Sequence, residues 1–121
     1  MSMDRVREYL EDNGYAKHLV EGGREGLIRR WREFVSEVEK GYKLGLEDYR
    51  NDLDLRMIIQ TAQAEDAEVR ELDERLRKML TPTKKRLWES GAGKPFWDFG
   101  YPRNASGQLL RDLKLEGIEI K

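Results

Sequence analysis

The chain has 121 residues, of which 39% are charged, yet its formal net charge is only −1. High charge of balanced sign argues against a dedicated polyanion-binding protein and against the uncompensated charge of a disordered chain. The sequence holds no cysteine, which excludes disulfides, thiolate nucleophiles and cysteine-ligated metal sites. The length is enough for one domain, and we expect residues 1–121 to form a single helical domain.

The first residues of the chain are charged rather than apolar, so they do not resemble a secretory signal. No run approaches the ~18 consecutive apolar residues that a membrane-spanning helix needs. We therefore expect a cytoplasmic protein that makes no membrane contact.

The N-terminal region predicts two helices joined by glycines. Residues 4–12 predict a first short helix, and Asn13-Gly14 is a good C-terminal cap because both residues tolerate positive φ. We expect residues 15–20 to add a helical turn or two. Three glycines at positions 22, 23 and 26 then predict a flexible lead into the next helix.

Residues 27–40 carry the clearest pattern in the sequence. Apolar residues recur at the spacings of one helix face, and charged residues or Ser36 fill the other positions up to Val38. The pattern predicts a surface helix packed on the core through one face. The apolar positions are Leu27, Ile28, Trp31, Phe34, Val35 and Val38.

Residues 46–80 contain no Gly or Pro and are rich in good helix formers. One helix of this length would span roughly 52 Å, whereas a compact chain of this size is about 35 Å across. The helix therefore breaks, or the molecule is elongated, or a second chain covers the excess, which makes homodimerisation a hypothesis. The weakest helical stretch, at residues 60–64, is the expected break. The alternation across residues 53–59 also fits a half-buried strand, although length and composition favour a helix.

The C-terminal third predicts two helices separated by an aromatic loop. Thr81-Pro82 predicts the start of a helix that ends near Ser90. Residues 94–104 form a loop dense in aromatic side chains. Ser106 is a candidate cap for a last helix, and Gly117 is its expected end.

These elements predict an all-α fold: an irregular bundle of four to six helices with one long central helix, straight or bent, and an aromatic-rich C-terminal loop. No set of residues typical of a catalytic site stands out. The only histidine, His18, has no cysteine partner in the chain and is expected to be a structural residue at the surface or partly buried. We therefore expect no cofactor and do not expect an enzyme.

An acidic cluster is the one candidate metal site. Asp48 and Asp52 stand four residues apart, on one face of the expected helix, with Asp54 close by. Carboxylates at this spacing can share a divalent ion through oxygen ligands. The simpler interpretation is a solvated face braced by Arg50 and Arg56, with Asp52 and Arg56 forming an ion pair.

The aromatic loop is the candidate partner-binding site. Four aromatic residues fall between positions 96 and 101. They close the open end of the bundle, form a partner-binding surface, or do both at once, with Phe96 and Phe99 inward and Trp97 and Tyr101 at the rim. Exposed Trp, Tyr and Arg are the usual anchors of protein interfaces, so the predicted binding residues are Trp97, Tyr101 and Arg103.

Three functional hypotheses remain. The first is a small helical protein–protein interaction module, such as an inhibitor, immunity-type or adaptor protein without catalytic activity. The second is a metal-binding or metal-dependent helical enzyme that uses Asp48, Asp52 and Asp54. The third is weak nucleic-acid binding by the basic and aromatic C-terminal part, which its interspersed acidic residues disfavour.

Overall fold

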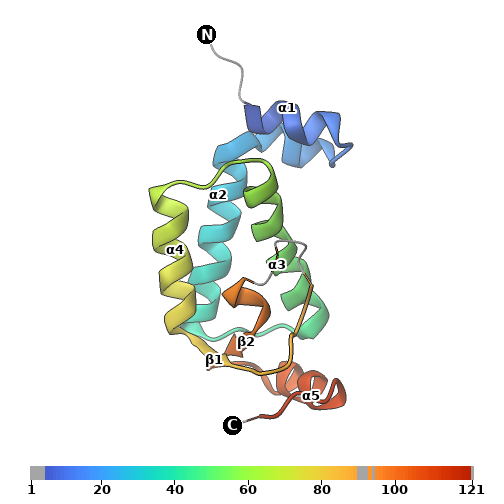
Figure 1. The fold of residues 1–121 in the computed structure, drawn as a ribbon, viewed down its shortest axis with the longest axis vertical. Helices are drawn as coiled ribbons and strands as arrows, with labels where there is room; N and C mark the ends of the chain where they lie inside the picture. Colours follow the sequence, from blue (N-terminus) through green and yellow to red (C-terminus); the bar gives the residue numbers. More distant parts are fainter. Residues whose placement is uncertain (1–4, 90–92, 94, 121) are drawn as a thin grey trace.

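The computed structural model describes residues 5–89, 93 and 95–120. Five α-helices and one two-stranded sheet make up its regular structure, together with a short 3₁₀ helix labelled η1. The expected all-α bundle is confirmed. Figure 1 shows α2, α3 and α4 side by side, with α1 across one end and α5 at the other. The elements are α1 Arg5–Asp12, α2 Lys17–Lys40, α3 Leu46–Thr61, α4 Ala67–Lys78, β1 Leu80–Pro82, η1 Phe96–Asp98, β2 Gly100–Pro102 and α5 Gly107–Leu115.

Helix α2 is the longest helix and packs against α1, α3 and α4. It starts at Lys17, earlier than its glycines suggested, and it is kinked where Gly23 has φ 55° and ψ −149°. This backbone conformation favours glycine because a side chain would be strained there. Beyond the kink, all six apolar residues of the predicted stripe are buried.

Residues 46–80 form two helices rather than one. Helix α3 ends at Thr61, and α4 begins after Asp66, whose side chain accepts a hydrogen bond of 2.8 Å from the backbone N–H of Val69. The break expected at residues 60–64 is thus confirmed, and the strand alternative for residues 53–59 is wrong. No 35-residue helix therefore overhangs the bundle, and the overhang that suggested homodimerisation does not exist in residues 46–80.

The predicted helix starting at Thr81 is also wrong. Residues Leu80–Pro82 instead pair antiparallel with Gly100–Pro102, with Thr81 opposite Tyr101. The loop that follows β1 stays beside the aromatic loop: the N–H of Leu87 donates to the carbonyl of Asp98 at 2.7 Å. The backbone groups of this segment form hydrogen bonds with residues that are distant in the sequence. A local helical pattern cannot reveal such bonds. The expected end of this helix, at Ser90, lies outside the described residues.

Helix α5 follows the prediction closely. Ser106 accepts a hydrogen bond of 3.1 Å from the N–H of Leu109, and Gly117 ends the segment with φ 78°. Leu109 and Leu113 are buried, and Ile118 packs back onto the core.

Candidate functional site

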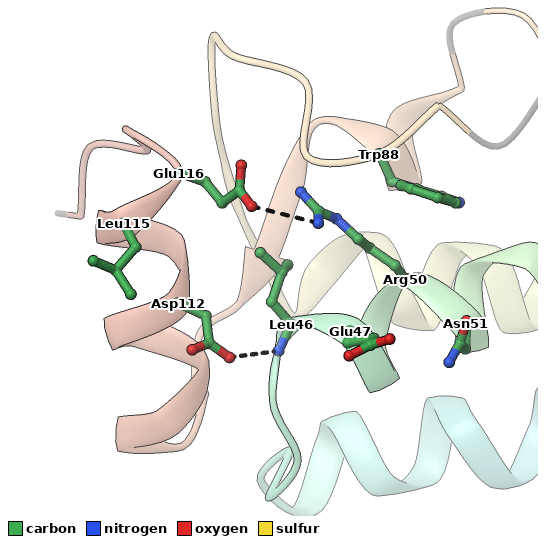
Figure 2. A pocket seen from close by; sticks show the side chains of 8 residues that line it. All are labelled: Leu46, Glu47, Arg50, Asn51, Trp88, Asp112, Leu115 and Glu116. Atoms are coloured by element: carbon green, nitrogen blue, oxygen red, sulfur yellow. Dashed lines mark hydrogen bonds and ion pairs between the residues drawn. The ribbon is translucent and has the colours of Figure 1, made fainter.

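The N-terminal end of α3 and the C-terminal part of α5 enclose an open depression of about 470 Å³, which we call the α3–α5 cleft. Its lining residues are drawn in Figure 2: Leu46, Glu47, Arg50, Asn51, Trp88, Asp112, Leu115 and Glu116. The two helices are joined by Asp112, which accepts a hydrogen bond of 3.0 Å from the backbone N–H of Leu46. Gly45 has no side chain to cap α3 itself, and a Cβ there would lie 2.9 Å from the Asp112 carboxylate. An acidic residue of α5 therefore caps α3 and fixes the shape of the cleft.

Arg50 lies in the middle of the cleft and is held from three sides. Its Nε donates to the carbonyl of Leu87 at 3.1 Å, and its Nη1 lies 3.6 Å from the Glu116 carboxylate. Its guanidinium carbon is 5.5 Å from the ring centroid of Trp88. Figure 2 shows the arginine between these two side chains. The contacts fix the guanidinium without burying it, so it remains available to an incoming group.

The apolar part of the cleft is exposed. Leu115 on α5 is 87% exposed, the highest value among the exposed large apolar side chains of the described residues, and Trp88 is only half-buried. A depression that combines a Trp, an Arg and an exposed Leu has the composition of a protein-binding surface.

A second depression, of about 320 Å³, lies between α2 and α3, and we call it the α2–α3 groove. Its apolar side chains are Leu19, Phe34, Leu55 and Ile58. Its acidic side chains are Glu33 and Glu37 from α2 and Asp52 and Asp54 from α3. Within the described part of the chain, none of these four carboxylates forms an ion pair.

Neutral donors hold the two aspartates of the groove. The Tyr42 hydroxyl donates to Asp52 at 2.6 Å, and the Trp88 indole N–H donates to Asp54 at 2.6 Å. Burial raises the pKa of Asp52, the Tyr42 bond lowers it, and the nearby charges of Glu37 and Asp48 raise it further. Burial and the Asp52 carboxylate raise the pKa of Tyr42, so the phenol stays protonated as the donor. Arg30 also lines the groove, so four carboxylates stand against one arginine and the groove holds an excess of negative charge.

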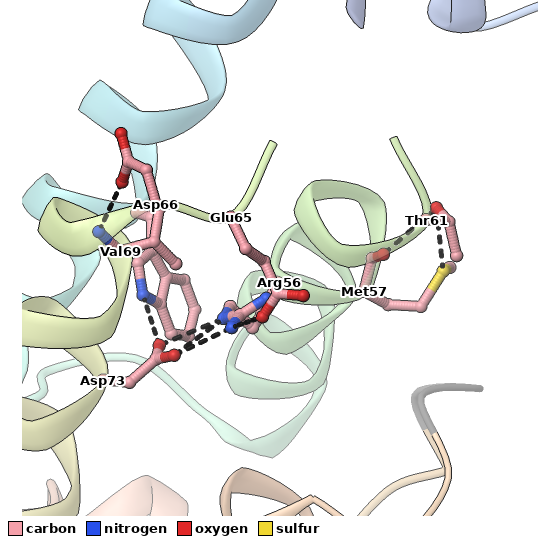
Figure 3. A network of polar contacts seen from close by, with 8 residues as sticks. Arg56, Met57, Thr61, Glu65, Asp66, Val69 and Asp73 are labelled. Atoms are coloured by element: carbon pink, nitrogen blue, oxygen red, sulfur yellow. Dashed lines mark hydrogen bonds and ion pairs between the residues drawn. The ribbon is translucent and has the colours of Figure 1, made fainter. Parts of the chain in front are cut away.

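A buried ionic network occupies the opposite side of α3, toward α4. Arg56 is 2% exposed and donates to Asp73 at 2.8 to 3.3 Å and to Glu65 at 2.5 Å, as Figure 3 shows. The Trp31 indole donates to the same Asp73 carboxylate at 3.1 Å. The guanidinium carbon of Arg56 lies 4.6 Å from the ring centroid of Trp97. The network ties α2, α3, α4 and η1 together, because Trp31, Arg56, Asp73 and Trp97 belong to these four elements.

This network corrects the expected bracing of the acidic cluster. Arg56 points into the core and pairs with Asp73 and Glu65, so it does not form the predicted ion pair with Asp52. Arg50 pairs with Glu116 rather than with an acidic residue of its own helix. The interpretation as a face neutralised by its own arginines is therefore wrong.

The metal-site alternative gains no geometric support. Asp52 and Asp54 are bonded to different partners, and Asp48 is exposed. Among the residues that the structure describes, no group of three or more His, Asp or Glu side chains is placed to hold a metal ion. His18 is exposed, as expected.

The predicted orientation of the aromatic loop is reversed. Trp97 and Tyr101 are 5% and 3% exposed and belong to the core, whereas Phe96 and Phe99 are half-buried. The reason is that Trp97 stacks on the buried Arg56, and Tyr101 lies on the strand that pairs with β1. Of the three predicted binding residues, only Arg103 is exposed. Both rings therefore offer little exposed area to a partner, although Trp97 lines the floor of a surface depression together with Phe96 and Arg77.

Two basic residues of the C-terminal part are held by groups of the fold itself. Arg86 donates to the buried Asp98 at 2.8 and 3.1 Å, and Lys85 donates to the backbone carbonyl of Glu116. Lys94, another basic residue of this part, lies outside the described residues. The contacts of Arg86 and Lys85 leave less of the basic charge for the nucleic-acid hypothesis.

Sequence reasoning missed Trp88, Arg50 and Leu115 as a set. One signal was available: Leu115 falls two positions after Leu113, away from the apolar face of α5. The approach of Trp88 to Arg50 had no such signal, because the sequence placed Trp88 on a helix that does not form.

No helix in the described part of the chain combines the length and the apolar character that crossing a bilayer requires. No family model, curated protein or solved structure matches the chain. The α3–α5 cleft and the α2–α3 groove are therefore the features of the molecule that bear on its function.

Proposed function

We propose that this protein is a small helical interaction module without catalytic activity, and that it binds another protein at the α3–α5 cleft. The observation that carries the proposal is one depression lined by Trp88, Arg50 and the exposed Leu115. Arg and Trp are enriched among residues that dominate binding energy, and an exposed leucine beside them supplies apolar area to bury.

The cleft is also prepared for binding. Arg50 is already held by Leu87 and Glu116, so little side-chain freedom is lost when a partner engages it. Asp112 accepts a hydrogen bond from the first N–H of α3, so one contact links the two walls of the cleft. A preformed cleft favours affinity because ordering costs less on association.

The test compares two leucines. Tagged wild-type protein and the variants Leu115→Gln and Leu44→Gln are used to capture partners from lysate of the cells that make the protein. Leu44 is the other exposed large apolar residue of the described chain, is 47% exposed, and lies outside the cleft. We expect Leu115→Gln to weaken capture of a specific protein by at least about tenfold, because a buried leucine contributes roughly 1.5 kcal/mol or more.

Circular dichroism and melting temperature must show that both variants fold as the wild type does. Leu44→Gln is expected to retain the same protein. Equal capture by wild type and Leu115→Gln would place the interaction elsewhere and overturn the proposal for this cleft.

A further inference from the structure

The α3–α5 cleft and the α2–α3 groove are neighbours along α3. Asn51 lines both depressions. The hydrogen bond from Trp88 to Asp54 crosses from the cleft to the groove, because Trp88 lines the first and Asp54 lines the second. One binding segment that follows α3 can therefore occupy both.

The combined surface is strongly acidic in a chain that is nearly neutral. Its described residues include seven carboxylates, three in the cleft and four in the groove, against two arginines, Arg30 and Arg50. Of the seven, only Glu116 forms an ion pair, and its partner is Arg50 itself. The whole chain carries a formal charge of only −1. A depression lined by one sign of charge attracts a partner of the opposite sign and selects against others.

The excess charge follows from where the arginines of α3 point. Arg56 lies inside the bundle with Asp73, and Arg50 turns toward Glu116 at the end of α5. The half-buried aspartates of the groove therefore lack the cations that follow them in the sequence. A cationic side chain from another molecule finds these carboxylates unpaired.

Charge alone does not describe the surface. Leu55 and Ile58 are half-buried in the groove, and Leu115 is exposed beside the cleft. A small polyamine would leave this apolar area uncovered. A segment with apolar residues on one face and Lys or Arg beside them covers both kinds of surface.

We propose that the partner of this module presents a cationic amphipathic segment, which lies along α3 from the α3–α5 cleft into the α2–α3 groove. This inference rests on the proposed function, because it names the partner chemistry of the same site. The apolar residues of the segment pack on Leu115, Leu55 and Ile58, and its cations meet the carboxylates of Glu33, Glu37 and the two groove aspartates.

The experiment uses designed peptides rather than a natural partner. A fluorescently labelled peptide of Leu and Lys, about four helical turns long, carries its leucines on one face. Its counterparts replace every Lys by Glu, or scramble the same residues so that no apolar face remains. Fluorescence anisotropy measures the dissociation constant of each peptide for the full chain at two salt concentrations.

Matched double variants locate the binding. Glu33→Gln with Glu37→Gln removes two charges from the groove. Glu11→Gln with Glu71→Gln removes two charges from exposed residues outside both depressions. We expect the groove pair to raise the dissociation constant of the cationic peptide by roughly tenfold and the control pair by less than about twofold. Added salt should weaken binding of the cationic peptide to the wild type.

Binding of the Lys peptide alone, with selective loss in the groove pair, supports the inference. Equal binding of the Lys and Glu peptides, no binding of the Lys peptide, equal binding of the scrambled peptide, or equal loss in both double variants overturns it. Failure of the peptides while Leu115→Gln still abolishes capture of a natural partner leaves the proposed function standing and refutes only the cationic segment. Failure of both experiments refutes the proposed function as well.

Discussion

Helices α3 and α4 both pack against α2, but the charged residues are arranged differently at the two contacts. Toward α4, three ion pairs cross between the helices or their caps: Arg24 with Asp66, Arg32 with Glu68, and Glu39 with Arg75. Toward α3, the acidic residues Glu33, Glu37, Asp52 and Asp54 face one depression and form no ion pair among the described residues.

The difference separates a contact in which the charges are paired within the fold from one in which four carboxylates have no ion pair among the described residues. Paired charges across α2 and α4 satisfy one another, so a further charged molecule gains little there. The acidic residues between α2 and α3 repel one another, and a cation that binds among them relieves that repulsion. The predictions below test each side of this contrast.

The largest expected effect is on the α4 side, at the buried network. Arg56→Ala leaves Asp73 buried without its cation and should lower the free energy of unfolding by about 4–5 kcal/mol. Urea unfolding followed by circular dichroism measures the loss. Glu65→Gln is the matched change at the exposed end of the network, and we expect it to lower stability by less than about 1 kcal/mol. Similar effects of the two variants would show that Arg56 is not held in the core.

The aromatic loop gives the next largest effect. Trp97→Ala removes a core ring that packs on Arg56, and the expected loss of unfolding free energy is about 3–4 kcal/mol. Arg103→Ala changes an exposed residue of the same predicted site and should change stability by less than about 0.5 kcal/mol. Thermal and urea unfolding of both variants provide the comparison. If Trp97→Ala were as stable as the wild type, this ring would not belong to the core and would again be a candidate binding residue.

The elements that the sequence predicted correctly depend on local patterns. The apolar stripe of residues 27–38, the break after Thr61 and the cap at Ser106 all follow from helix periodicity or capping chemistry within a few residues. The burial of each stripe residue also followed, because one face of an amphipathic helix must cover the core.

The elements that it predicted wrongly depend on contacts between distant residues. The segment after Thr81 forms a strand because Leu80–Pro82 meets Gly100–Pro102. Arg56 is buried because it pairs with Asp73 and Glu65, and both of these residues come after the break between α3 and α4. The cleft of Trp88, Arg50 and Leu115 joins three segments, so spacing along the sequence marked Leu115 as outward-facing but could not bring the three residues together.

The charged contacts of α4 itself predict a moderate effect. Asp66 caps α4 through the N–H of Val69, which lowers the pKa of its carboxyl, and Arg24 lowers that pKa further. A carboxyl with a lowered pKa stabilises the fold fully above its ordinary pKa, and the contribution is lost as pH falls through the lowered value. Asp66→Ala should therefore lower the free energy of unfolding by about 1 kcal/mol near neutral pH.

Asp66→Asn separates the cap from the charge. The amide oxygen can still accept from Val69, so this variant should lose less stability than Asp66→Ala while losing the acid-dependent part. Unfolding curves over a pH series measure both. If the alanine and asparagine variants lose the same amount, the cap contributes nothing and the ion pair with Arg24 alone stabilises this end of α4.

The smallest effect lies in the α2–α3 groove, and it has the opposite sign. Burial raises the pKa of Asp52, against the hydrogen bond from Tyr42, and Glu37 and Asp48 raise it further. A carboxyl whose pKa is raised on folding contributes fully to stability below its ordinary pKa, and this contribution is lost as pH rises through the raised value. Asp52→Asn keeps an oxygen for Tyr42, so it should be slightly more stable than the wild type near neutral pH.

The advantage of Asp52→Asn should shrink as pH falls, because the wild-type carboxyl then becomes neutral too. Urea unfolding over a pH series measures it, with Glu11→Gln as the control at an exposed carboxyl outside the groove. A neutral-pH stability below that of the wild type would mean that the fold already gains from the charge of Asp52. The carboxylate would then be compensated as on the α4 side, and no cation would be needed to relieve it. If Asp52→Asn gains stability at neutral pH and loses the gain in acid, the charge of Asp52 destabilises the fold. The two sides of α2 then differ as described, and a cationic partner could relieve the repulsion among the groove carboxylates.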